Sequence, residues 1–201
     1  MIRAANRRTG LLAALRRCWR GDRASQIVEF ALSLPLLVLF VVGIFDFSGA
    51  ISLKQKLTNA AREGARVAAS DPANDLGSVP KSGVPASVAD AFWVVDNYLI
   101  SENIADCGLS GDIPKQTAGT LTWKSTAAGP PCGSSAGLLL TINRGCITKP
   151  IINGTVVNMV GTCVTIQYPY KWQFNNVAGL LGGKFTGPTS LTATSTAFNE
   201  N

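Results

Sequence analysis

The sequence predicts an α+β protein with one long N-terminal helix, a second helix and a small antiparallel β-sheet. Three observations lead to this fold class. An apolar run in the N-terminal quarter continues into a helical pattern, and a second helical pattern follows near residue 90. Beyond residue 108 the composition changes to Gly, Thr, Ser and Pro, with short β-type runs between turn residues. Helical and strand signals therefore occupy separate parts of the chain, as in α+β folds.

The positive charge of the chain is concentrated at its N-terminus. The first 24 residues contain seven arginines and one acidic residue, Asp22, which together account for the formal net charge of +6. The remaining 11 basic and 11 acidic residues cancel, so residues 25–201 are neutral. A nucleic-acid interface would place basic residues on the face of a folded domain, whereas this arm directly precedes an apolar run. We therefore expect no nucleic-acid partner and a cytoplasmic location for residues 1–24.

Residues 30–45, FALSLPLLVLFVVGIF, form an apolar run without a charge between Glu29 and Asp46. The wider segment 26–47 would be roughly 33 Å long as an α-helix, enough to cross a ~30 Å hydrocarbon core. The arginine-rich flank favours a membrane span over a buried helix of a soluble domain, and it places the chain after about Ala50 outside the cytoplasm. Pro35 lies in this run and is compatible with a membrane helix that has a local kink.

The helical pattern continues beyond the apolar run. Apolar and small residues recur at steps of 4, 4, 3 and 4, on one face of a helix: Leu53, Leu57, Ala61, Gly64 and Ala68. The spacing predicts a helix from Ser25 to Ser70, which ends before Asp71-Pro72 because proline disfavours a helical residue before it. Such a helix has about 45 residues and is roughly 68 Å long. Residues 71–201 are then an extracytoplasmic α+β domain.

This C-terminal region begins with a loop at residues 80–85 and a second helix from Ser87. Val88, Phe92, Val95 and Leu99 recur in that helix at helical spacing, and Asp106-Cys107-Gly108 is expected to close it. The expected strands are Gly119–Lys124, Leu138–Asn143, Thr155–Tyr168 with a bend at Gly161, and Leu191–Phe198. Short connections make an antiparallel sheet the natural arrangement, packed on the second half of the long helix. Four aromatic residues are expected in or around that interface: Trp93, Trp123, Trp172 and Phe174.

The cysteines predict two disulfide bonds. Cys18 lies in the basic arm, and four cysteines follow the apolar run: Cys107, Cys132, Cys146 and Cys163. An even number outside the cytoplasm, without Cys-x-x-Cys spacing, favours disulfides over a zinc site. Three connectivities are possible, and the sequence does not choose among them.

The composition argues against catalysis. The chain has no histidine, which excludes Ser-His-Asp and Cys-His nucleophile activation and zinc sites with His ligands. The carboxylates Asp90, Asp96 and Glu102 lie on the predicted second helix and form no acid/base pair. We therefore expect no catalytic residue, no metal and no cofactor.

Residues 23–69, RASQIVEFALSLPLLVLFVVGIFDFSGAISLKQKLTNAAREGARVAA, resemble the TadE-like family of pilin-like proteins from the bacterial tight adherence (Flp pilus) secretion machinery. The matching features are the SQIVEFAL start with Glu29, the apolar stretch through Leu34-Pro35, the GIFDF segment with Asp46, and the LTNAAREGAR helix. The resemblance implies a type IV pilin-like fold. It also implies a structural, non-enzymatic role as a minor pilin-like (pseudopilin) subunit that supports pilus biogenesis and surface adherence.

The resemblance further implies processing and a set of partners. A prepilin peptidase in the inner membrane cuts such chains before the apolar helix, so that glutamate is the fifth residue of the mature protein. Counting back from Glu29 places the cut between Ala24 and Ser25, although glycine is commoner before the cut. The alternative, between Gly21 and Asp22, would make Glu29 the eighth residue. Other pilin-like subunits are the expected assembly partners.

Two carboxylates are the expected assembly residues. The buried Glu29 would pair with the new α-amino group at Ser25 of a neighbouring subunit in a bundle of apolar helices. Asp46 is expected either at the outer membrane interface or in a second polar contact.

Two other interpretations of the sequence remain open. The chain could be an uncleaved single-pass membrane-anchored binding protein that keeps residues 1–24 and forms no polymer. Alternatively, Ser48-Gly49-Ala50 fits the small-x-small site of an ordinary signal peptidase, which would release a soluble domain that begins at Ile51. A domain released in this way would keep the helical pattern that follows Leu53 but lose the apolar segment that precedes it in the same predicted helix.

Overall fold

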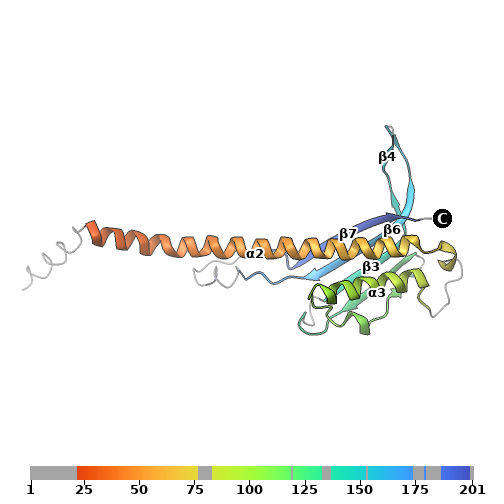
Figure 1. Ribbon diagram of the computed structural model, residues 1–201, viewed down its shortest axis with the longest axis horizontal. Coiled ribbons are helices and arrows are strands. Elements are labelled where there is room, and N and C mark those ends of the chain that lie inside the picture. Colours follow the sequence, from red (N-terminus) through yellow and green to blue (C-terminus); the bar gives the residue numbers. More distant parts are fainter. Residues whose placement is uncertain are drawn as a thin grey trace, which may run out of the picture. The chain divides into compact units, whose positions relative to one another are not determined.

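The computed structural model describes residues 22–76, 83–118, 120–132, 137–152, 154–173, 179 and 187–199. The chain divides into two compact units, Met1–Asp46 with Gln173–Phe185, and Phe47–Trp172 with Thr186–Asn201. The expected fold class is confirmed, because a long apolar N-terminal helix, a second helix and an antiparallel sheet are all present (Figure 1).

The long helix, α2, extends from Asp22 to Ser70 and contains Pro35. It starts three residues earlier than expected and ends where the sequence predicted, directly before Asp71-Pro72. In the first unit its apolar side chains are mostly exposed, among them Phe30, Leu32 and Phe45. An uncovered apolar helix of this length is typical of a segment that needs lipid or other helices around it.

In the second unit, one face of α2 belongs to the hydrophobic core. The residues predicted to share that face are buried, apart from the partly buried Leu53. Small residues on this face allow a close approach of the second helix, α3 (Ala86–Ser101). A Cβ at Gly64 would lie 2.6 Å from Val95 Cγ2 of α3, so only glycine fits there. The sequence pattern thus reflects a tight α2–α3 contact.

The main sheet has five antiparallel strands in the order β1-β2-β3-β6-β7. Its strands are β1 (Lys115–Gln116), β2 (Thr122–Ala127), β3 (Leu138–Thr148), β6 (Met159–Pro169) and β7 (Ser190–Phe198). One face of the sheet joins α2 and α3 in a single core, to which Trp123, Leu140 and Ile166 belong. The other face carries polar residues such as Thr165 and Thr194, whose hydroxyl oxygens lie 3.0 Å apart.

Several predicted boundaries were wrong. The expected strand Thr155–Tyr168 is two strands, because β5 (Thr155–Val156) pairs with β4 (Ile151–Ile152) in a separate two-stranded sheet and β6 begins only at Met159. Gly161 is no bend: it lies within β6, where a Cβ would come 2.5 Å from Ala197 O of β7. Helix α3 ends at Ser101, and Asn103 and Cys107 have positive φ values before the 3-10 turn η2 (Leu109–Gly111).

Two other strands also differ from prediction. β3 continues to Thr148, because a bulge between Asn143 and Cys146 shifts its register and lets pairing with β6 resume. β2 lies at Thr122–Ala127 rather than 119–124, and Gly119 is outside the described residues. The loop at 80–85 is described only at residues 83–85, which lie before α3.

The four aromatic residues occupy different environments. Trp123 is buried in the core, whereas about half of Trp93 is exposed. Trp172 packs on Phe47 and Tyr170, with ring centroids 5.3 and 4.9 Å apart. Phe174 lies outside the described residues. Trp123 therefore belongs to the predicted interface, and Trp93 lies at its surface.

Candidate functional site: the polar residues of the N-terminal helix

The structure places the expected processing junction in the first turn of α2. Ala24 and Ser25 are its third and fourth residues, and Asp22 of the alternative junction is its first. Gly21 lies outside the described residues. A cut between Ala24 and Ser25 would leave residues 25–70 of α2 in the remaining chain.

Ser25 and Glu29 lie one helical turn apart, on the same face of α2. Both side chains are exposed, and Glu29 forms no ion pair or hydrogen bond with any residue that the structure describes. The carboxylate stands directly before the apolar run of residues 30–45. In hydrocarbon such a charge is expensive unless a cation accompanies it. Among the described residues, the Glu29 carboxylate thus has no cation beside it at the start of the apolar run.

Asp46, in contrast to the exposed Glu29, is covered by the rest of the chain. Its residue is buried, at 7% exposure, and it already has a polar or ionic partner within the chain. The two carboxylates that bracket the apolar run thus differ: Glu29 is open to a neighbour, and Asp46 is enclosed. Both remain predictions as assembly residues, and the structure shows only that their exposure differs.

Helix α2 is the one described helix that is long and apolar enough to cross a membrane, within Ser25–Ser70. No residue of its most apolar window is buried, although Leu39, Val42 and Gly43 are partly covered. A core helix of a soluble domain would be covered on at least one face. The exposed apolar surface fits a membrane location for this segment.

Both predicted disulfide bonds are present in the second unit. Cys107 is bonded to Cys132, and Cys146 is bonded to Cys163, with Cα–Cα distances of 5.5 and 5.7 Å. The second bond joins adjacent strands β3 and β6 beside the bulge. Closing loops of this size stabilises a fold by about 3 kcal/mol each in the chain-entropy model. The bonds leave no free thiol among the cysteines that the structure describes.

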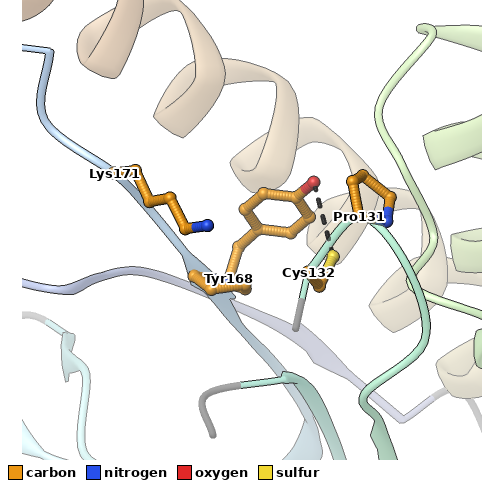
Figure 2. Close-up of a pocket in the computed structure, with 5 residues that line it drawn as sticks. Pro131, Cys132, Tyr168 and Lys171 are labelled. Atoms are coloured by element: carbon orange, nitrogen blue, oxygen red, sulfur yellow. Dashed lines mark hydrogen bonds between the residues drawn. The ribbon is translucent and has the colours of Figure 1, made fainter. Parts of the chain in front are cut away.

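A small pocket lies next to the first disulfide. Pro131, Cys132, Tyr168, Pro169 and Lys171 line it, and its volume is about 180 Å³ (Figure 2). The Tyr168 hydroxyl lies 4.0 Å from Cys132 Sγ, as the dashed line in Figure 2 shows. Burial, and secondarily the negative charge of Asp106, raises the pKa of Tyr168, so its hydroxyl stays protonated. A protonated phenol beside an oxidised sulfur offers neither a base nor a nucleophile.

A buried arginine is the residue that sequence reasoning missed. Arg144 lies in the β3 bulge and is 1% exposed. It donates from Nη1 to Thr162 Oγ1 and from Nη2 to Asp71 O, each at 3.1 Å. The available signal was the Asn-Arg-Gly break in the otherwise alternating run LLLTINRGCIT, which is typical of a bulge. Its role is structural, because it ties the end of α2 to the sheet.

The fold and the site together define a disulfide-bonded α+β protein with one N-terminal helix suited to a membrane. Residues 24–66 match the family model described as TadE-like protein. Comparison with curated proteins and with solved structures gave no match. The resemblance found in residues 23–69 is thereby confirmed for the N-terminal helix, and the matched family is one of structural proteins associated with the tight adherence (Tad) pilus machinery. Among the described residues, no group of His, Cys, Asp or Glu could hold a metal ion.

Proposed function

We propose that this protein is a minor pilin-like (pseudopilin) structural subunit of a bacterial tight adherence pilus, which assembles through its N-terminal helix and supports pilus biogenesis and surface adherence. One observation carries the proposal. Ser25 and the exposed Glu29 lie one turn apart at the start of an uncovered apolar helix. The match of residues 24–66 to TadE-like proteins supports it.

Processing by a prepilin peptidase creates the chemistry that assembly needs. Cleavage between Ala24 and Ser25 removes the arginine-rich leader and gives Ser25 a free α-amino group. That group is largely protonated near neutral pH, and Glu29 is a carboxylate. When helices of neighbouring subunits pack together, the amine of one subunit and Glu29 of the next can pair. The pair is strongly favoured over either charge left alone in a medium of low dielectric constant, so it fixes the axial register.

The proposed topology follows from the same segments. Residues 1–24 are cytoplasmic until they are removed, residues 26–47 cross the inner membrane, and residues 71–201 form the extracytoplasmic domain. Two disulfide bonds in the second unit support this arrangement, because such bonds persist in oxidising compartments. The prepilin peptidase and other pilin-like subunits are the proposed partners.

The alternative of a released soluble domain fits the structure less well. Ser48, Gly49 and Ala50 all lie inside α2, and Ala50 is buried. A cut after Ala50 would also remove Phe47 from its contact with Trp172. A released domain that begins at Ile51 would therefore lack a packing contact that the second unit shows.

The N-terminal sequence of the protein purified from its own cell envelope tests the proposal. Ser25 as the first residue supports prepilin-type processing with Glu29 in fifth position, and Asp22 supports the alternative junction. An N-terminal Ile51 would mean a released domain. An intact Met1 would mean an uncleaved membrane anchor, and the proposed assembly mechanism would then lose its positive partner for Glu29.

A further inference from the structure

The β4–β5 region of the second unit is a two-stranded ribbon with an apolar surface. Strands β3 and β6 pair through Ile147 and Val160, and β4 and β5 pair through Ile151 and Val156. Between them Val157 N donates to Pro150 O at 3.0 Å, so the pairing continues without a change of register. Figure 1 shows this ribbon, labelled β4, extending away from the rest of the sheet.

No described strand flanks this ribbon. The pairing of β2 with β3 stops at Asn143, and the pairing of β7 with β6 stops at Gly161. A two-stranded hairpin alone is marginally stable in water.

One face of the ribbon is mostly aliphatic. Side chains two residues apart in a strand share a face, so the cation Lys149 lies between the cross-strand pairs Ile147–Val160 and Ile151–Val156. The four aliphatic residues of that face are more than half exposed: Ile147 64%, Ile151 72%, Val156 59% and Val160 57%.

A second exposed patch of the same unit has complementary chemistry. Trp93 and Ile100 are exposed on α3, and Asp90 and Asn97 share their face of the helix at spacings of three and four residues. Trp93 packs edge-to-face on the buried Phe92, with ring centroids 5.2 Å apart, which fixes its orientation. Asp90 and Lys149 form no ion pair among the described residues.

We infer that the apolar face of the β3–β6 and β4–β5 ribbon docks on the outer face of α3 in a second copy of this chain, with Lys149 opposite Asp90. Charge complementarity favours a second copy as the partner of the ribbon. The ribbon presents the cation Lys149 between two apolar pairs, and α3 presents the anion Asp90 on the same face as Trp93. In Figure 1, β4 and α3 lie on opposite sides of α2. The contact is therefore heterologous, and it can repeat from copy to copy.

A lipid surface fits the apolar face of the ribbon less well than a second copy does. Segments that lie on an anionic bilayer combine aliphatic residues with several cations, whereas the ribbon offers one. A stable interface buries about 800 Å² per partner, more than four aliphatic side chains provide. The contact is thus expected where copies are already concentrated in a membrane or filament. It requires no N-terminal processing, so an intact Met1 would refute the proposed maturation and leave this contact standing.

The test uses the full chain in its own envelope, with a photo-crosslinking amino acid in place of Ile151. The expected product is an adduct with the mass of two chains that maps to α3. A matched probe at Lys124, which is exposed on β2, should give little of this adduct. Lys149→Asp and Asp90→Lys should each lower the yield by up to about fivefold, and the double variant should restore it.

Charge reversal at two exposed positions should leave the fold unchanged, and disulfide formation on a non-reducing gel checks this for each variant. An adduct to lipid or to a different protein would overturn the inference, as would the absence of any adduct. Failure of the double reversal to restore the yield would overturn the assigned pairing of Lys149 with Asp90.

Discussion

Arg144 donates a 3.1 Å hydrogen bond from Nη2 to the carbonyl oxygen of Asp71, the residue that follows α2. The same guanidinium donates to Thr162 Oγ1, and the Thr162 hydroxyl lies 2.7 Å from Asn199 Oδ1. A buried cation thus connects the end of the long helix, the β3 bulge, strand β6 and the residue after β7. Burial lowers the pKa of Arg144, and the negative charges of Asp75 and Asp71 partly offset this by raising it. The guanidinium remains charged at any physiological pH.

Replacing Arg144 should destabilise the second unit. Arg144→Met keeps the aliphatic stem but removes the donors to Thr162 and Asp71, so buried acceptors lose their partners. We expect the free energy of unfolding to fall by about 1–3 kcal/mol, measured by denaturant titration of the full chain in detergent. Arg66→Met is the matched control, because Arg66 forms an exposed ion pair with Glu63 and should change stability by about 0.5 kcal/mol or less. Equal losses in the two variants would contradict the assigned role.

Gly64→Ala should also destabilise the protein, because the new Cβ would lie 2.6 Å from Val95 Cγ2. Overpacking at such a contact costs about 1–3 kcal/mol and outweighs the better helix propensity of alanine. The second substitution Val95→Ala should recover part of the loss in a double-mutant cycle. At Gly49 a Cβ would lie 3.5 Å from the Tyr170 hydroxyl, so Gly49→Ala should be neutral or stabilising. A neutral Gly64→Ala would mean that α3 does not approach α2 closely.

Ionisation of Asp96 should lower the free energy of unfolding as the pH rises. Burial, and then the charge of Asp106, raises the pKa of Asp96, and its Oδ1 has no hydrogen-bond partner. The folded state therefore holds this proton more tightly than the unfolded state. The stabilisation is complete below the unfolded pKa of about 3.8 and is lost as the pH rises through the folded pKa. Asp96→Asn should raise stability at pH 7 and flatten this part of the profile.

Asp112 provides a control of opposite sign. Burial would raise its pKa, but hydrogen bonds from the Thr126 backbone N–H, Lys115 and Ser125 together lower it. Its stabilisation is present above the unfolded pKa and lost as the pH falls through the folded pKa. Asp112→Asn should therefore reduce stability at pH 7. Thermal unfolding of both variants between pH 3 and pH 8 separates the two effects, and shifts in the same direction would contradict the assignment.

Glu29→Gln should block incorporation of the subunit into the assembled complex while leaving the fold of the second unit unchanged. The amide can accept a hydrogen bond but carries no charge, so the α-ammonium group of a neighbour would be buried without a compensating anion. We expect incorporation, measured by co-purification with sheared surface filaments, to fall about tenfold or more. Glu63→Gln on the same helix is the control, because Glu63 pairs with Arg66 within the chain. Normal incorporation of Glu29→Gln would refute the proposed pairing.

Local signals in the sequence were sufficient for the helical part of the fold. The charge-free run, the steps of four and three residues after Leu53, and Asp71-Pro72 predicted the extent of α2 to within three residues. These signals succeed because helical hydrogen bonds join residues four positions apart, so the pattern and the structure have the same range. The motif around Glu29 is equally local, and it sufficed for the match to TadE-like proteins.

The tertiary structure alone decided the features that depend on distant pairs. It selected one of three disulfide connectivities, divided residues 155–168 between β5 and β6, and buried Arg144 against Asp71, 73 positions earlier. It also enclosed Asp46 while Glu29 remained exposed, although both bracket the same apolar run. Strand register and burial depend on which residues meet across the fold, and neither the spacing nor the composition of a short segment specifies its partner.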